Sequence, residues 1–154
     1  MNHLLNSMIA RAEGEYLERE AQELIIDFVS ELPQRFALMN ELASSEGAIL
    51  EDTLATFYER FPMVDQRHRE NSPGGVRDLR LVLRYASMAY VLDDLRYLDE
   101  KLLSWLRPIL HSYLETEAID FAFASLVTTA REHLSRRVGD LISPYLERSR
   151  DLLV

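Results

Sequence analysis

The stretch from residue 72 to residue 94 constrains the fold of this chain more than any other. It opens with a Ser-Pro-Gly-Gly turn, and the apolar residues that follow it have helical spacing. We therefore predict a helix from about Gly75 to Leu92. An arginine and an aspartate, Arg77 and Asp78, lie side by side in its first turns. A helix this apolar must be buried by other elements, so we expect the rest of the chain to pack around it.

Helical spacing also dominates the segments on either side, and no segment has a convincing strand pattern. Pro33 is expected to kink or briefly break one long helical segment, and residues 44–47 to stop one helix and start the next. Residues 63–75 form one long irregular segment. The sequence thus predicts an all-α domain of about six to eight helices. Besides the central helix, they are expected at residues 1–12 and 16–43, from a cap at Ser44 or Ser45 to about Arg60, and at residues 98–113, 117–134 and 137–153.

The size and composition of the chain limit the kinds of protein to which it can belong. With 154 residues and 47% hydrophobic residues, we expect a single domain with a real core, spanning residues 1–154. No apolar run is long enough for a membrane span, and no signal peptide opens the chain. The chain has no cysteine, which excludes disulfides, thiolate metal sites and thioether-linked cofactors. We expect a cytoplasmic protein.

The net charge of −9 argues against binding to nucleic acid or to an anionic membrane surface. The charge is uneven, however. Between Arg60 and Arg84 there are six arginines, including Arg67 and Arg69, and three acidic residues, so this segment carries a charge of +3. Such a patch favours a small anionic ligand; an ordinary solvated loop with surface arginines explains it equally well.

The Arg77–Asp78 pair has two interpretations. A carboxylate at a helix start can accept N–H hydrogen bonds from a ligand, and an arginine can bind a ligand carboxylate with two hydrogen bonds. Alternatively, the aspartate is favoured there by the helix dipole and the arginine is a surface residue.

The remaining candidates are histidines and aromatic residues. The histidines have no metal-binding spacing; His111, in an apolar helix, could ligate haem or could simply be a satisfied core or rim residue. Trp105, Tyr113, Phe121 and Phe123 could enclose a flat aromatic ligand or belong to the core. No nucleophile–base arrangement is visible, so we predict no enzyme and no catalytic residue. We also predict no metal site.

These residues resemble a known family, the phycobiliproteins. Their motif C-x-R-D-x-x-x-x-L-R-Y-x-[ST]-[YF]-A is similar to the stretch that begins at Arg77 and continues through Leu83-Arg84-Tyr85 to Ala89. A second motif, G-D-x-x-x-L-D-[DE], is similar to residues 93–100, and weaker likenesses at residues 10–17 and 141–146 extend the resemblance over nearly the whole chain.

The resemblance implies a globin-like helical domain, here residues 33–154, preceded by an N-terminal helical hairpin, here residues 1–32. It implies a linear tetrapyrrole (bilin) lying along the central helix. Asp78 would accept hydrogen bonds from the pyrrole nitrogens, and Arg77 would pair with a propionate. Further ligand-binding residues are then expected to be the cations Arg67, Arg69 and Arg84 and the aromatic residues Tyr85, Trp105, Phe121 and Phe123.

Several positions depart from the family pattern. Gly75 stands where the family has its bilin-attaching cysteine, so a bilin here would be bound non-covalently. Gly74, Leu81 and Val82 also differ, and Arg11 replaces an aspartate that pairs across the family's subunit interface with the arginine matched by Arg84. The closer likeness is to the cysteine-lacking bilin biosynthesis-associated globins of bacteria.

The sequence therefore predicts a bacterial protein that binds biliverdin or a reduced bilin, as a carrier or holder linked to bilin-synthesis enzymes. We expect a homodimer formed through the hairpin, and no nucleic-acid or membrane partner. Two alternatives stay open at this point. One is an interaction or regulatory protein that kept the globin fold without a ligand, and the other is a haem-binding globin sensor that uses His111.

Overall fold

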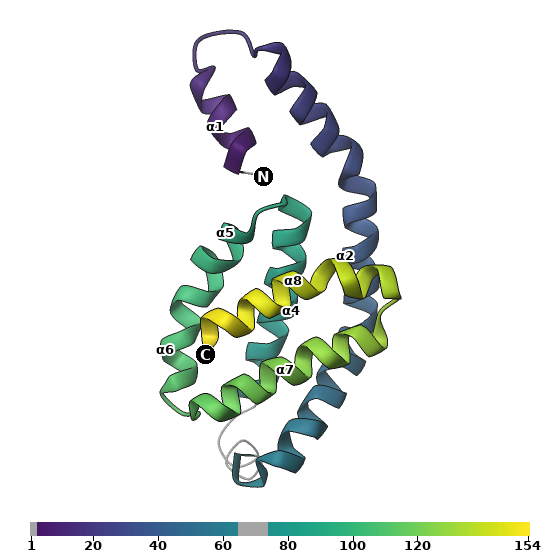
Figure 1. The fold of residues 1–154 in the computed structure, drawn as a ribbon, viewed down its shortest axis with the longest axis vertical. Helices are drawn as coiled ribbons and strands as arrows, with labels where there is room; N and C mark the ends of the chain where they lie inside the picture. Colours follow the sequence, from purple (N-terminus) through teal and green to yellow (C-terminus); the bar gives the residue numbers. More distant parts are fainter. Residues whose placement is uncertain (1–2, 65–73) are drawn as a thin grey trace.

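The computed structural model describes residues 3–64 and 74–154, and every regular element within these ranges is helical, as predicted (Figure 1). No strand occurs in the described ranges, and no helix in them is long and apolar enough to cross a membrane. The elements, in chain order, are α1 (His3–Arg11), α2 (Arg19–Arg60), α4 (Gly74–Leu92), α5 (Leu95–Leu98), the π-helical turn η1 (Asp99–Leu103), α6 (Ser104–His111), α7 (Thr116–His133) and α8 (Arg136–Leu153).

Helix α2 is continuous, so the predicted break at residues 44–47 is wrong. The helix runs for 42 residues and contains Pro33 and Gly47. Both lie on the exposed side, where a missing hydrogen bond or side chain costs little packing. The Ser44 hydroxyl donates to the Glu41 carbonyl, 2.9 Å away, instead of capping a new helix. The predicted division between hairpin and core at residue 32 thus lies inside one helix.

Helix α4 lies at the centre of the body and packs against α2 and α8, while α7 and α8 pack against each other (Figure 1). One face of α4 is buried throughout and carries Leu79, Val82, Leu83, Ala86 and Ala89. The alanines at 86 and 89 allow neighbouring helices to approach closely, and the larger residues fill the remaining space. Burial of this apolar face is the main driving force for assembling the body.

Residues 95–111 form an almost continuous helical segment, which the sequence predicted only from residue 98 onward. It begins at Asp94, whose carboxylate accepts the backbone N–H of Arg96 at 3.1 Å. The wider turn η1 places the consecutive residues Leu102 and Leu103 in the core. This segment carries Trp105 and leads to Tyr113, and both residues bear on the candidate site.

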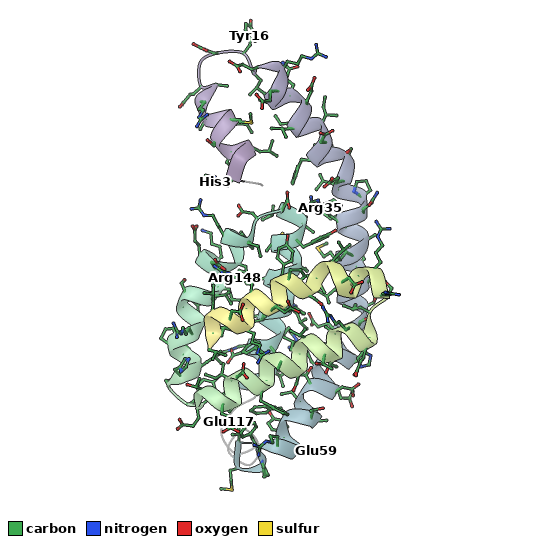
Figure 2. The ribbon with its side chains drawn as sticks, viewed as in Figure 1. His3, Tyr16, Arg35, Glu59, Glu117 and Arg148 are labelled. Atoms are coloured by element: carbon green, nitrogen blue, oxygen red, sulfur yellow. The ribbon has the colours of Figure 1, made fainter. Side chains whose placement is uncertain are left out.

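The N-terminal hairpin extends away from the body. Helix α1 lies beside the first turns of α2, and Tyr16 is at the tip of the hairpin (Figures 1 and 2). Arg35 sits where α2 reaches the end of α4 (Figure 2), and its side chain is only 11% exposed. Its Nη1 donates to the Tyr90 carbonyl at 2.7 Å, and its Nη2 donates to Glu31. The guanidinium also lies 5.4 Å from the centre of the Tyr90 ring.

These contacts make Arg35 the anchor between α2 and the end of α4. We predict that Arg35→Ala lowers the free energy of unfolding by about 2–3 kcal/mol, because it removes charge-assisted hydrogen bonds in a buried setting. The control is Arg19→Ala, which removes an exposed arginine paired with Glu23 and should change stability by less than about 0.5 kcal/mol. Urea unfolding followed by circular dichroism measures both; equal effects would contradict the anchoring role.

Candidate functional site

Asp78 is a buried carboxylate near the start of α4. It is 2% exposed, whereas the side chain of its neighbour Arg77 is 66% exposed. The two residues are about 100° apart around the helix, so one points into the body and the other toward solvent. A carboxylate this buried needs hydrogen-bond donors, since leaving it unpaired in an apolar setting is costly.

Two side chains supply those donors. The Nε and Nη2 atoms of Arg77 each lie 3.1 Å from Oδ1 of Asp78. The hydroxyl of Tyr113 donates to Oδ2 at 2.5 Å. Burial, followed by this hydrogen bond to Asp78, raises the pKa of Tyr113 well above its usual range, so the hydroxyl keeps its proton at neutral pH. Tyr113 thus connects the turn after α6 to the central helix.

A small apolar cavity lies beside Asp78. It is lined by residues of α2, α4 and α7 and of the segment that ends α6, namely Leu54, Phe57, Gly75, Asp78, Leu79, Leu110, Tyr113, Leu114, Ile119, Ala122 and Phe123. Its volume of about 30 Å³ is room for roughly one water molecule. Pockets that hold drug-sized ligands are roughly 300–1,000 Å³. A large ligand can therefore enter here only if part of the lining moves.

The structure brings together only some of the predicted ligand-binding residues. Asp78 and Phe123 line the cavity, and Arg77 lies at its edge through its contact with Asp78. Phe121 packs edge-to-face on Phe61, with ring centres 5.7 Å apart, in a small separate cluster. Arg67 and Arg69 lie outside the described residues.

Tyr85 and Trp105 are placed elsewhere. Tyr85 stacks on Tyr97 with ring centres 5.8 Å apart, and neither ring lines the cavity. Trp105 is 42% exposed on α6, and its indole N–H donates to the Lys101 carbonyl at 2.7 Å. The sequence shows that these aromatic residues belong to helices on or after the central one. It does not show toward which neighbour each ring points once the helices pack together.

Arg84 faces a different partner from the one expected. Its Nε and Nη2 atoms donate to the two carboxylate oxygens of Glu46 on α2, at 2.8 and 2.9 Å. Arg80, one turn earlier on α4, lies 3.2 Å from the same carboxylate. The hydrogen bond from Arg84 lowers the pKa of Glu46 below its usual value, although partial burial opposes the shift. No motif or spacing in the sequence marks Glu46, because its two arginine partners lie more than 30 positions away on another helix.

His111, on which the haem alternative rests, is hydrogen-bonded to the backbone. Nε2 of His111 is 2.8 Å from the Leu153 carbonyl, so this nitrogen carries the proton and donates to the backbone. His111 is also absent from the lining of the cavity beside Asp78. Within residues 3–64 and 74–154, no group of three or more histidine, aspartate or glutamate side chains could hold a metal ion.

Comparison with known proteins identifies the family. The model of the family described as "Phycobilisome protein" matches residues 8–153. The chain belongs to the phycobilisome protein family. This membership confirms the globin-like, all-α fold that the sequence predicted, as well as the resemblance to the phycobiliproteins. The match runs from α1 to the last helix, so it includes the hairpin as well as the body.

Relatives of this phycobilisome family protein include phycocyanin beta chains. It is 28% identical over 109 residues to the C-phycocyanin beta chain of Galdieria sulphuraria and 29% identical over the same length to the R-phycocyanin-1 beta chain of Porphyridium purpureum. The C-phycocyanin beta subunit of a Nostoc species is 27% identical over 109 residues. Each alignment covers 64% of the chain and 60% of the relative.

The Glu46 cluster predicts how stability depends on pH. Because the pKa of Glu46 is lowered in the folded state, its contribution is present above the ordinary glutamate value of about 4.5 and is lost as the pH falls below it. Glu46→Gln should therefore be less stable than wild type at pH 7, and the difference should shrink toward pH 3. Urea midpoints at the two pH values measure this. Glu51→Gln, at an exposed position of the same helix, is the control, and a difference that is constant with pH would contradict the prediction.

Proposed function

We propose that this protein binds a bilin, such as biliverdin or a reduced bilin, non-covalently and acts as its carrier or holder. The observation that carries the proposal is the adjacent Arg77–Asp78 pair at the edge of an apolar cavity, in a member of the phycobilisome family. A bilin has pyrrole N–H donors and propionate carboxylates on one flat, apolar frame. Such a ligand can satisfy both members of the pair at once after they separate.

The expected roles follow from burial. Asp78 is buried beside apolar residues, which suits an acceptor for ring N–H groups. Arg77 is mostly exposed, so its guanidinium can turn from Oδ1 of Asp78 to a propionate at little packing cost. Arg84 is a weaker candidate for a propionate because it is bound to Glu46. Roles for Arg67 and Arg69 remain predictions.

The absence of cysteine supports reversible binding. A thioether link needs a cysteine sulfur, and the chain has none. A pigment held only by hydrogen bonds, ion pairs and apolar contact can be released to another protein. This property suits a carrier that works with bilin-synthesis enzymes, and it is why we propose a binding rather than a catalytic role.

Titration of the purified protein with biliverdin tests the proposal. We expect a shifted absorbance spectrum for the wild type. Asp78→Ala should weaken binding roughly tenfold or more, because one charge-assisted hydrogen bond is worth about 1.5–3 kcal/mol, and Arg77→Ala should weaken it less. The controls Asp140→Ala and Arg136→Ala remove one exposed charge of each sign on α8 and should leave binding unchanged.

The second candidate is a ligand-free interaction or regulatory protein, and the small size of the cavity favours it. The biliverdin titration separates the two. The absence of a spectral shift in the wild type, together with a colourless protein after co-expression with bilin-making enzymes, would replace the first proposal with the second. A shift of equal size in wild type and in Asp78→Ala would mean that bilin binds outside this site.

We also propose a homodimer formed through the hairpin. Three large apolar residues of α2 stay exposed in the single chain: Ile26 and Val29 within the hairpin and Phe36 just beyond it. Covering this surface with a second copy would remove its contact with water.

Sedimentation velocity tests this assembly. Val29→Glu should convert the dimer to a monomer, because it would bury a charge in the interface. Leu141→Glu is the control, since it changes an exposed apolar residue on α8, outside the hairpin. A wild type that sediments as a monomer at all concentrations, or a Val29→Glu variant that remains a dimer, would count against the hairpin interface.

A further inference from the structure

Tyr113 occupies the place on Asp78 that a ligand would need. Its hydroxyl binds Oδ2, while Arg77 binds Oδ1. Because Asp78 is 2% exposed, a new N–H donor can reach the carboxylate only by replacing a group that covers it. Any ligand that uses Asp78 must therefore compete with a group of the protein itself.

Of the side chains in the cavity lining around the carboxylate, Tyr113 is one that reaches solvent. The residue is 38% exposed, whereas Leu79, Leu110 and Phe123 in the same lining are buried in the core. It also follows the end of α6, in a turn held by backbone bonds from Ser112 to Ile109 and from Leu114 to Leu110. Its side chain is therefore less enclosed than its apolar neighbours in the lining.

Movement of this ring would also change the size of the cavity. Tyr113 lines the roughly 30 Å³ cavity and is hydrogen-bonded to Asp78, which lines it too. With the ring turned outward, the space it filled joins the cavity, and the apolar walls from α2, α4 and α7 are left open to a flat ligand. The same displacement frees the carboxylate and opens the way to it.

We propose that Tyr113 is a displaceable plug: its hydroxyl binds Asp78 until an N–H donor ligand replaces it there. This inference rests on the proposed function and adds a regulation to that site. The plug also selects the ligand class. A ligand with a single weak donor gains little binding energy when it replaces the phenol on Asp78. A ligand with several converging N–H groups, or with a protonated donor, gains more binding energy.

The plug is neutral at physiological pH, because burial and the bond to Asp78 raise the pKa of Tyr113. The described groups that the protein places at this site are therefore one guanidinium, one carboxylate and a protonated phenol, and their charges balance. The experiment separates a plug from a fixed wall residue that donates to Asp78 with and without ligand.

The experiment is a biliverdin titration of wild type, Tyr113→Phe and Tyr145→Phe, with thermal unfolding of each apo protein. Tyr113→Phe removes only the competing hydroxyl, so we expect its Kd for biliverdin to fall roughly tenfold or more. The apo form of the same variant should unfold at a lower temperature, because Asp78 loses a donor. Tyr145→Phe, which changes a half-buried tyrosine on α8 outside the cavity, should leave the Kd unchanged.

A purely structural role for Tyr113 would weaken binding as stability falls, so tighter binding by a less stable variant is specific to a plug. Binding by Tyr113→Phe but not by wild type would support the plug as well. An unchanged or higher Kd for Tyr113→Phe, with clear binding by wild type, would overturn the plug and leave the proposed function intact. No binding by wild type or either variant would overturn both.

Discussion

The burial of Asp78 in the same face of α4 that forms the core is the constraint on which the candidate site depends. The apolar residues of that face pack against α2 and α8, and the carboxylate sits at one end of the packed surface. A buried charge must be paired, and here the partners come from its own helix and from the turn after α6. The central helix is thereby tied to the segment that leads into α7, and the charge of Asp78 is paired within the fold.

The three arginines of α4 fall into two groups that contact different partners. Arg80 and Arg84 face α2 and share Glu46, so they hold two helices together. Arg77 faces Asp78 and remains largely exposed, so on our proposal it is the arginine of α4 best placed to meet a ligand carboxylate. The positive segment of the sequence is therefore not one continuous anion-binding patch over its described part. Much of its charge is neutralised within the fold, which suits a site for one or two propionates rather than for a polyanion.

On our proposals, ligand binding at this site is an exchange of partners rather than the filling of an open pocket. The carboxylate exchanges a phenol for pyrrole N–H groups, and the guanidinium exchanges a carboxylate of the protein for one of the ligand. Each new contact with the ligand replaces a contact within the protein, so the net free energy of binding is smaller. The affinity is therefore limited, and the ligand is released more easily. Limited affinity is appropriate for a carrier without a covalent link.

The sequence by itself determined the all-α class, the central helix and its adjacent Arg77–Asp78 pair, because helical periodicity and turn residues act locally along the chain. It also excluded thioether chemistry, since no cysteine is present. It could not determine that α2 continues through residues 44–47, because packing along the whole helix overrides weak local stop signals. Only the tertiary structure decided that Arg84 turns to Glu46, that Trp105 faces solvent and that Tyr113 reaches Asp78. Those contacts join residues 35 or more positions apart or depend on side-chain direction, and neither spacing nor composition encodes them.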